Sequence, residues 1–391
     1  MKEALDYSNL CLTCGLCSSR CPMTGVDGFD PRKIIRLCVL GGFEEAVISR
    51  FPWLCTGCGR CTYFCPMGVD VPFIIEELKG LRPRDQVPGI LHKNVESVLQ
   101  KGNSPGLPEG EYRFVLEDVA AELAQESCPG FEIPVDKEEV EYLLFPHPKE
   151  VAIDAEDMKW MWHIFYKAGV TWTVPSKNWE SIDWGFFTGN MEVSKELARR
   201  KVEIAKELRV RTIILPDCGG SSFGCRYNLE KYFAQELKGS GIDYVYIYDV
   251  LIRFLKDGMI KVDKAKNPEA VTYHDSCKHG REALRVFGKG YFDEPRWIVE
   301  QCCEQPLIEM YPTRENSFCC GAGGGLYAGP YDKERFYHGR KKAESVKRTG
   351  AKAVIVSCSN CRDQIGGGLI KEYNLDIEVK YIWQLVAESL I

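Results

Sequence analysis

The sequence has no long apolar run and no excess of positive charge. Its longest apolar stretches, such as residues 212–215 and 353–356, are strand-sized, whereas a helix that spans a bilayer needs about 20 residues. The 50 Lys and Arg residues against 56 Asp and Glu give a net charge of −6, which excludes the basic surface that nucleic-acid binding requires. The first ten residues also lack the apolar segment of a signal peptide. We therefore expect a cytoplasmic protein with no direct membrane insertion, any peripheral membrane attachment coming through a partner subunit.

Cysteine, in contrast, is abundant, with 19 residues in a chain of 391. Small secreted scaffolds held by disulfides are shorter and contain more than about 8–10% cysteine. An odd number of cysteines also argues against complete pairing within the chain. Because 45% of the residues are hydrophobic, the chain can build real cores without disulfides. The cysteines therefore indicate metal or redox chemistry in a reducing compartment.

Two copies of the spacing C-x2-C-x2-C-x3-C, each followed by proline, stand near the N-terminus. They comprise Cys11, Cys14, Cys17 and Cys21, and then Cys55, Cys58, Cys61 and Cys65. This spacing is typical of cubane 4Fe–4S clusters, and in two-cluster ferredoxins the fourth cysteine of each run ligates the other cluster. We therefore predict one cluster on Cys11, Cys14, Cys17 and Cys65 and a second on Cys55, Cys58, Cys61 and Cys21. Zinc, the alternative, is usually held by two separated C-x2-C pairs.

Residues 1–100 are accordingly predicted to form a helical two-cluster ferredoxin-type module, and residues 101–149 a connector rich in Pro and Gly. Residues 150–262 and 263–391 then show the same order of elements. The second repeat should have strands at 271–273 and 353–356 and a helix at 333–348 ended by Gly350. The first should have strands at 151–153 and 212–215 and a helix at 193–208. The fold class is thus α+β and multidomain, with a duplicated α/β domain after the ferredoxin module.

The two repeats differ in their cysteines. Four cysteines of the second, Cys277, Cys319, Cys320 and Cys361, stand opposite Asp157, Asp183, Trp184 and Ser221 of the first. Only Cys358 has a counterpart, Cys218. Cys218 and Cys225 are either a residual thiol pair or simply buried, and Cys302 and Cys303 are interpreted as structural. We therefore expect the first repeat to have kept the scaffold and lost the site.

The five cysteines of the second repeat, spaced C-x41-C-C-x37-C-x2-C, resemble the cysteine-rich CCG domain of heterodisulfide reductase catalytic subunits. With the ferredoxin module in front, the chain resembles the D-type subunit of these enzymes, or their C-type and B-type subunits fused. Its single complete motif is similar to subunits of benzoyl-CoA reductase complexes and of a sulfite-reductase-linked membrane complex that acts on a sulfur carrier. Glycolate oxidase and anaerobic glycerol-3-phosphate dehydrogenase iron–sulfur subunits are also related. The resemblance implies one noncubane 4Fe–4S cluster on Cys277, Cys319, Cys320, Cys358 and Cys361.

Other residues near these cysteines are candidates for the same site. Gly321, Gly323 and Gly324 would let backbone N–H groups approach an anionic cluster, and the glycine run lacks the G-x-G-x-x-G spacing of a dinucleotide site. His274, beside Cys277, would lower thiol pKa values or stabilise a substrate thiolate. A satisfied core imidazole is an equally good interpretation of His274.

Three functions remain open at this stage. In the first, the chain is an oxidoreductase that reduces a disulfide-type substrate with electrons from the two cubane clusters. In the second, it is a non-catalytic relay in a multisubunit anaerobic complex, and in the third the second repeat binds zinc, which takes four ligands rather than five. The sequence has no flavin, nicotinamide or quinone signature. Donor and acceptor are therefore expected to be partner subunits, such as a flavoprotein, a ferredoxin-using complex or a membrane cytochrome.

Overall fold

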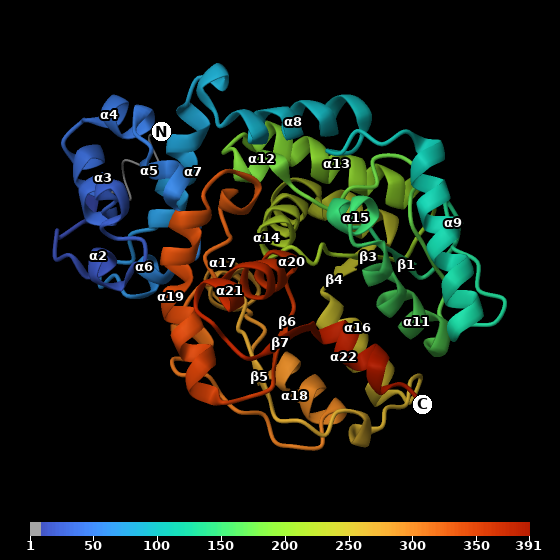
Figure 1. Cartoon of the computed structure of the whole chain (residues 1–391). Coiled ribbons are helices and arrows are strands. Elements are labelled where there is room, and N and C mark those ends of the chain that lie inside the picture. Colours follow the sequence, from blue (N-terminus) through green and yellow to red (C-terminus); the bar gives the residue numbers. More distant parts are fainter. Residues whose placement is uncertain (1–8) are drawn as a thin grey trace.

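The computed structural model describes residues 9–391 (Figure 1). All the regular elements described before residue 100 are helical. They are α2 Leu16–Arg20, α3 Pro31–Val39, α4 Phe43–Ile48, α5 Phe51–Leu54, α6 Arg60–Tyr63, α7 Val71–Leu81 and the start of α8 Gly89–Lys101. α3 begins with Pro31 at its first position, and the carboxylate of Asp30 accepts from the backbone N–H groups of the first turn. Ile34, Ile35, Ile74 and Ile75 fill the core of this module.

Helix α9 Glu109–Glu126 follows and leads into a sheet of four parallel strands in the order β2-β1-β3-β4. The strands are β1 Tyr142–Leu143, β2 Trp172–Thr173, β3 Thr212–Ile214 and β4 Asp243–Val245. Helices surround them, namely α10 Pro148–Ala152, α11 Met158–Ala168, α12 Trp184–Phe187, α13 Met191–Glu207, α14 Gly219–Asn228, α15 Ala234–Ser240 and α16 Ile247–Lys256. Phe186 and Phe187 of α12 share one apolar cluster with Ile74 and Ile75, so the ferredoxin module packs directly on this repeat.

The second repeat has a three-stranded parallel sheet in the order β5-β6-β7. Its strands are β5 Val271–Tyr273, β6 Ala353–Val356 and β7 Glu378–Tyr381, and its helices are α17 Ala283–Phe287, α18 Asp293–Cys302, α19 Asp332–Thr349, α20 Ser359–Asp363, α21 Ile370–Glu372 and α22 Ile382–Ser389. The predicted strands at 271–273 and 353–356 are confirmed. Helix α19 ends at Gly350, which has a left-handed φ of 64°. The α+β class is therefore confirmed.

The two repeats share local structure after β3 of the first sheet and after β6, the middle strand of the second. Cys218 follows β3 and caps α14, and Cys358 follows β6 and caps α20. Each helix then runs into a π-helical segment, Leu229–Phe233 in the first repeat and Gln364–Leu369 in the second. The two repeats thus share an unusual local structure at the place where the second carries its C-x2-C pair.

The prediction is wrong for one element of the first repeat. Residues 151–153 are not a strand, because Pro148–Ala152 form α10. His147 and Glu150 make a reciprocal capping box around Pro148, which starts a helix and overrides the short apolar run. The first strand of this repeat is β1, which lies in the segment assigned to the connector. The pairing of Asp157 with Cys277 fails with it, since the segment after β1 begins at residue 144.

Helix α19 lies beside the ferredoxin module, while α9 lies on the opposite side of the molecule (Figure 1). Two side-chain contacts tie α19 to the module, from Arg50 to Glu334 and from Arg340 to the carbonyl of Pro22 at 2.7 Å. The second repeat therefore reaches the N-terminal cysteines although some 300 residues separate them in sequence.

Candidate iron–sulfur centres

The four cysteines predicted to hold the first cluster line one cavity together. One cavity, of about 390 Å³, is lined by Cys11, Cys14, Cys17 and Cys65. Cys14 is exposed, as are Leu12 and Met67 at the rim. Gly15 has a φ of 83° and starts α2, so the chain turns sharply between the second and third cysteine of the motif. We call this the outer cavity.

A second cavity, of about 380 Å³, is lined by Cys55, Cys58, Cys61 and Cys21, again as predicted. Gly59, with a φ of 71°, repeats the turn made by Gly15. The cysteines of this inner cavity are half-buried or buried. Burial raises the pKa of the Cys55 thiol to about 11 and that of the Cys61 thiol well above its usual value. Buried thiols of this kind lose their protons only when a cationic group binds them, so the site fits a metal cluster.

The third cavity, of about 460 Å³, is lined by the five motif cysteines of the second repeat, and we call it the CCG cavity. Cys277 follows β5, Cys319 and Cys320 lie on the loop before α19, and Cys358 and Cys361 lie at the start of α20. The Sγ atoms of Cys320 and Cys361 are 3.3 Å apart. His274 places Nε2 3.2 Å from the Sγ of Cys361, so this predicted residue lies at the site.

The three predicted glycines lie at the CCG cavity in two roles. Gly321 donates its backbone N–H to the Sγ of Cys319 at 3.3 Å and has a φ of 105°. Gly323 and Gly324 line the cavity and also pack against the second N-terminal cysteine run, residues 55–65, which we call the inner motif. A Cβ on Gly323 would overlap the carbonyl oxygen of Thr56, and one on Gly324 that of Cys55. These two glycines therefore allow the second repeat to approach the inner cavity.

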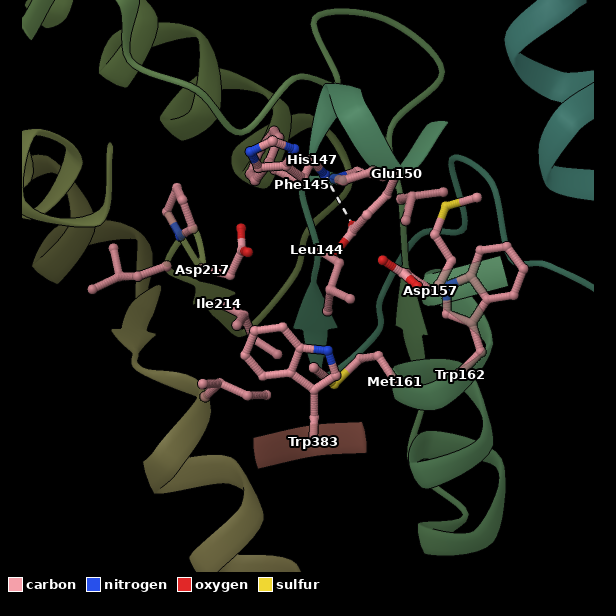
Figure 2. Close-up of a pocket in the computed structure, with 16 residues that line it drawn as sticks. Leu144, Phe145, His147, Glu150, Asp157, Met161, Trp162, Ile214, Asp217 and Trp383 are labelled. Atoms are coloured by element: carbon pink, nitrogen blue, oxygen red, sulfur yellow. Dashed lines mark hydrogen bonds between the residues drawn. The ribbon is translucent and has the colours of Figure 1, made fainter. Parts of the chain in front are cut away.

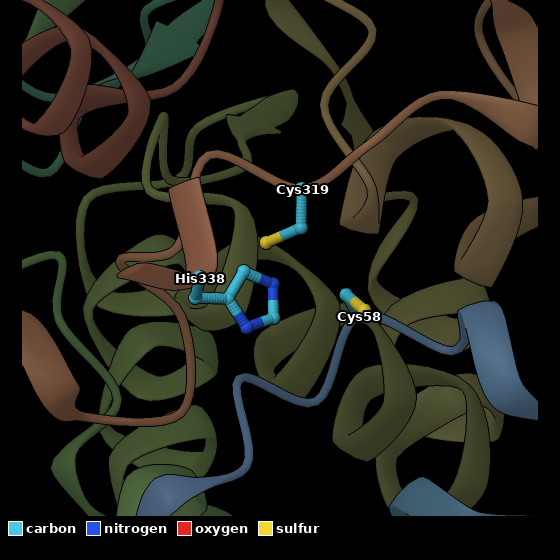
Figure 3. A group of neighbouring side chains, drawn as sticks. All are labelled: Cys58, Cys319 and His338. Atoms are coloured by element: carbon cyan, nitrogen blue, oxygen red, sulfur yellow. The ribbon is translucent and has the colours of Figure 1, made fainter. Parts of the chain in front are cut away.

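The inner and CCG cavities are immediate neighbours. Thr56 lines both, and its hydroxyl lies 3.8 Å from the Sγ of Cys319. The ligand atoms of Cys58, Cys319 and His338 all lie within 4.8 Å of one another, and Figure 3 shows the imidazole between the two cysteine loops. His338 was not predicted from the sequence. Its only signal there is its place on the buried face of α19, with Lys342 and Val346 at helical spacing.

The first repeat supplies walls to the CCG cavity. Phe186, Phe187, Gly219 and Gly220 line it together with Glu76 of the ferredoxin module and Lys278. In place of cysteines, the first repeat has polar hydrogen bonds: the N–H of Asp183 donates to the Oγ of Ser221 at 2.9 Å, and the Oγ of Ser194 to Asp183 at 2.5 Å. Segments that meet through Cys320 and Cys361 in the second repeat thus meet through Asp183 and Ser221 in the first.

A different cavity, of about 630 Å³, lies at the strand ends of the first repeat (Figure 2). His147, Glu150, Asp157 and Asp217 face it opposite Met161, Trp162 and Trp383. Asp157, predicted to stand opposite Cys277, instead pairs with Arg362 at this cavity. Burial and the neighbouring carboxylates of Asp217 and Asp157 raise the pKa of Glu150 well above its usual value.

The remaining cysteines are buried. Burial raises the pKa of the Cys225 thiol to about 12, and those of Cys302 and Cys303, at the end of α18, to about 12 and 11. Cys218 is buried at the start of α14, and its pKa is likewise raised by burial. Cys302 and Cys303 do not line any of the three cysteine cavities described above.

Two family models match the segments that carry the motif cysteines. The CCG family model, a cysteine-rich domain, matches residues 271–366, and a 4Fe–4S dicluster domain model matches residues 7–69. The D-type subunit of the dihydromethanophenazine:CoB–CoM heterodisulfide reductase of Methanosarcina acetivorans is 26% identical over 97% of this chain and 93% of its own length. The chain resembles this heterodisulfide reductase protein throughout.

Other relatives of this heterodisulfide reductase-like chain carry different names. The B-type subunit of the CoM/CoB fumarate reductase of Methanothermobacter marburgensis is 26% identical over 96% of this chain and 71% of its own length. A probable membrane-anchored ferredoxin of Chromohalobacter salexigens is 23% identical over 97% of this chain and 59% of its own. The protein is thus an iron–sulfur protein of the oxidoreductase type with a role in electron transfer. Within residues 9–391, no helix is both long and apolar enough to cross a membrane.

Proposed function

We propose that the chain takes up electrons at a cubane 4Fe–4S cluster in the outer cavity and passes them through a cubane cluster in the inner cavity to a noncubane 4Fe–4S cluster. Cys11, Cys14, Cys17 and Cys65 would hold the first cluster, and Cys55, Cys58, Cys61 and Cys21 the second. The five CCG cysteines, Cys277, Cys319, Cys320, Cys358 and Cys361, would hold the third. When bound, the clusters supply one-electron carriers.

The contact between the inner and CCG cavities carries this proposal. Cys58 and Cys319 belong to different predicted ligand sets, yet their sulfur atoms lie within 4.8 Å of each other. The outer cavity opens to solvent at Cys14, where a partner subunit can approach. Val71 lines both the outer and the inner cavity, and Thr56 lines both the inner and the CCG cavity, so the three cavities would form a route from the surface to the CCG cavity.

At the CCG cavity we propose reduction of a disulfide-type substrate. The reaction R–S–S–R′ + 2e⁻ + 2H⁺ → RSH + R′SH breaks one S–S bond and needs two electrons and two protons. Phe186 and Phe187 shield the cavity from water, and Lys278 lines it beside Cys277, where an ammonium group would stabilise a departing thiolate. His274 would hold Cys361 through its ring nitrogen.

The relay is the second candidate, and the first repeat favours it. Where a second cluster would sit, Asp183, Ser194 and Ser221 are hydrogen-bonded to one another instead. In a relay the electrons continue to another subunit that carries out the chemistry. Partners in either case would be a flavoprotein, a ferredoxin-using complex or a membrane cytochrome, the last of which would place the chain at a membrane surface.

Iron content and electron paramagnetic resonance (EPR) spectra test the cluster assignment. Three four-iron clusters require about 12 iron atoms per chain, whereas an empty or zinc-filled CCG cavity leaves about 8. Cys320→Ser should remove the noncubane signal and leave both cubane signals. Cys302→Ser, a buried cysteine outside the cavities, is the matched control and should leave all three.

The choice between enzyme and relay needs a substrate-type probe. Adding a small disulfide or its thiol should perturb the EPR signal of the oxidised noncubane cluster if substrate binds there. A spectrum with full iron that stays unchanged would reject the disulfide reductase and leave the relay.

A further inference from the structure

His338 is a buried imidazole with unused hydrogen-bonding capacity. It is 1% exposed, and both ring nitrogens lack a partner among the described residues. A buried polar nitrogen without a partner is costly and uncommon in folded proteins. The ring lines the inner cavity together with Cys58 and Cys61. Its missing partner is therefore to be sought in what fills that cavity.

The packing of α19 fixes the ring at this place. We call the loop of residues 319–325 the CCG loop. Gly339, the residue after His338, packs against this loop so closely that a Cβ there would lie 2.6 Å from the carbonyl oxygen of Cys320. Arg340 donates to the carbonyl of Pro22, which follows the first cluster motif. Both contacts hold the turn that carries His338 between the ferredoxin module and the CCG loop (Figure 3).

The inner cavity differs from the outer one in the groups that surround it. Buried Arg60 lines it, and buried Arg281 donates Nε–H to the carbonyl of Cys58 at 2.9 Å. The outer cavity is lined by one Arg, Arg32, which is exposed. His338 adds an imidazole whose two ring nitrogens both lack a partner among the described residues, and a ring N–H is a hydrogen-bond donor.

We infer that His338 donates a ring N–H to sulfur at the inner cluster and holds the reduction potential of that cluster above the value it would have beside an apolar side chain. The inference rests on the cluster assignment proposed above. The couple is [4Fe–4S]²⁺ + e⁻ ⇌ [4Fe–4S]⁺, and an N–H donor favours the more negative, reduced form. His338 thereby promotes electron transfer from the outer to the inner cluster, the step that carries electrons away from the surface.

The test is an EPR-monitored redox titration of the full, cluster-loaded chain. His338→Leu should lower the inner midpoint by about 59 mV, a tenfold change in the one-electron equilibrium. The outer midpoint should stay in place, and the noncubane midpoint should shift less than the inner one, because His338 lines the inner cavity and not the CCG cavity. A parallel Cys14→Ser variant, which removes a ligand of the outer cluster, identifies the inner signal. His163→Leu, a half-buried histidine of α11 remote from the cysteine cavities, is the control and should change no midpoint.

A second pair of variants covers the case in which His338→Leu loses iron. His338→Gln keeps an N–H donor and His338→Met does not, while their volumes are similar. The inner midpoint should be higher in the Gln variant, and equal midpoints would overturn the inference. Failure of the proposed function is a separate result. About 8 iron atoms per wild-type chain would reject the noncubane cluster but leave the comparison of inner midpoints intact.

Discussion

The backbone N–H of Gly219 donates to the Sγ of Cys358 across 3.2 Å, which joins the first repeat to a predicted ligand of the second. Gly219 is the first residue of α14, so the positive end of that helix points at the sulfur. The first repeat has lost four of the five cysteines and still contributes a hydrogen-bond donor to the CCG cavity. The first repeat therefore contributes to the CCG cavity through this hydrogen bond as well as through packing.

Replacing this donor should alter the noncubane cluster alone. Gly219→Pro removes the N–H, and proline is tolerated at the first position of a helix after a residue with extended dihedrals, as Cys218 has. We expect the noncubane midpoint to fall by about 60 mV, the equivalent of about 1.4 kcal/mol. Gly219→Ala also adds a Cβ but keeps the N–H, so its noncubane midpoint should stay close to the wild-type value. Equal midpoints in the two variants would show that the N–H does not act on the cluster.

The contact between the CCG loop and the inner motif should be sensitive to a single methyl group. Gly324 has a φ of 66°, and its Cβ would overlap the carbonyl oxygen of Cys55. Gly324→Ala is therefore expected to cost at least about 2 kcal/mol of unfolding free energy. Anaerobic thermal unfolding measures this loss. Gly239→Ala in α15, where a Cβ meets open space, should be neutral or stabilise by up to about 1 kcal/mol.

Glu180 should make stability depend on pH. It lies 2% exposed and accepts from Ser104 and from Nε1 of Trp184 at 2.5 Å, yet burial raises its pKa to about 7. Because the folded-state pKa lies above the unfolded value of 4.5, this contribution to stability is full below about pH 4.5 and is lost as pH rises through 7.

Unfolding midpoints of wild type and Glu180→Gln at several pH values between 5 and 8 test this contribution. Glu180→Gln should lower stability overall, since an amide cannot accept from all the donors. Stability should also decline less steeply with rising pH in this variant than in wild type. The difference in slope should integrate to at most about 3 kcal/mol. Parallel curves for the two proteins would mean that Glu180 does not change its charge in this range.

Local spacing in the sequence was enough to predict that the first three cysteines of each N-terminal run line one cavity, with turns at Gly15 and Gly59. The fourth cysteine of each run lines the cavity of the other run, as the two-cluster pattern predicts. The strands at 271–273 and 353–356 and the helix end at Gly350 were also predictable, since each depends on residues close in sequence. The strand predicted at 151–153 was wrong because the capping box of His147 and Glu150 starts helix α10, and an apolar run of three residues is too short to override it.

The sequence by itself predicted the chemistry: thirteen cysteines in motifs typical of iron–sulfur clusters, with one repeat that carries the full five-cysteine motif and one that does not. Only the tertiary structure decided how the sites are connected. Cys58 of the N-terminal module meets Cys319 and His338 of the second repeat, and Gly219 reaches Cys358 from the first repeat. Such contacts depend on how whole modules pack, through close approaches at Gly324 and Gly339, and no local spacing encodes them.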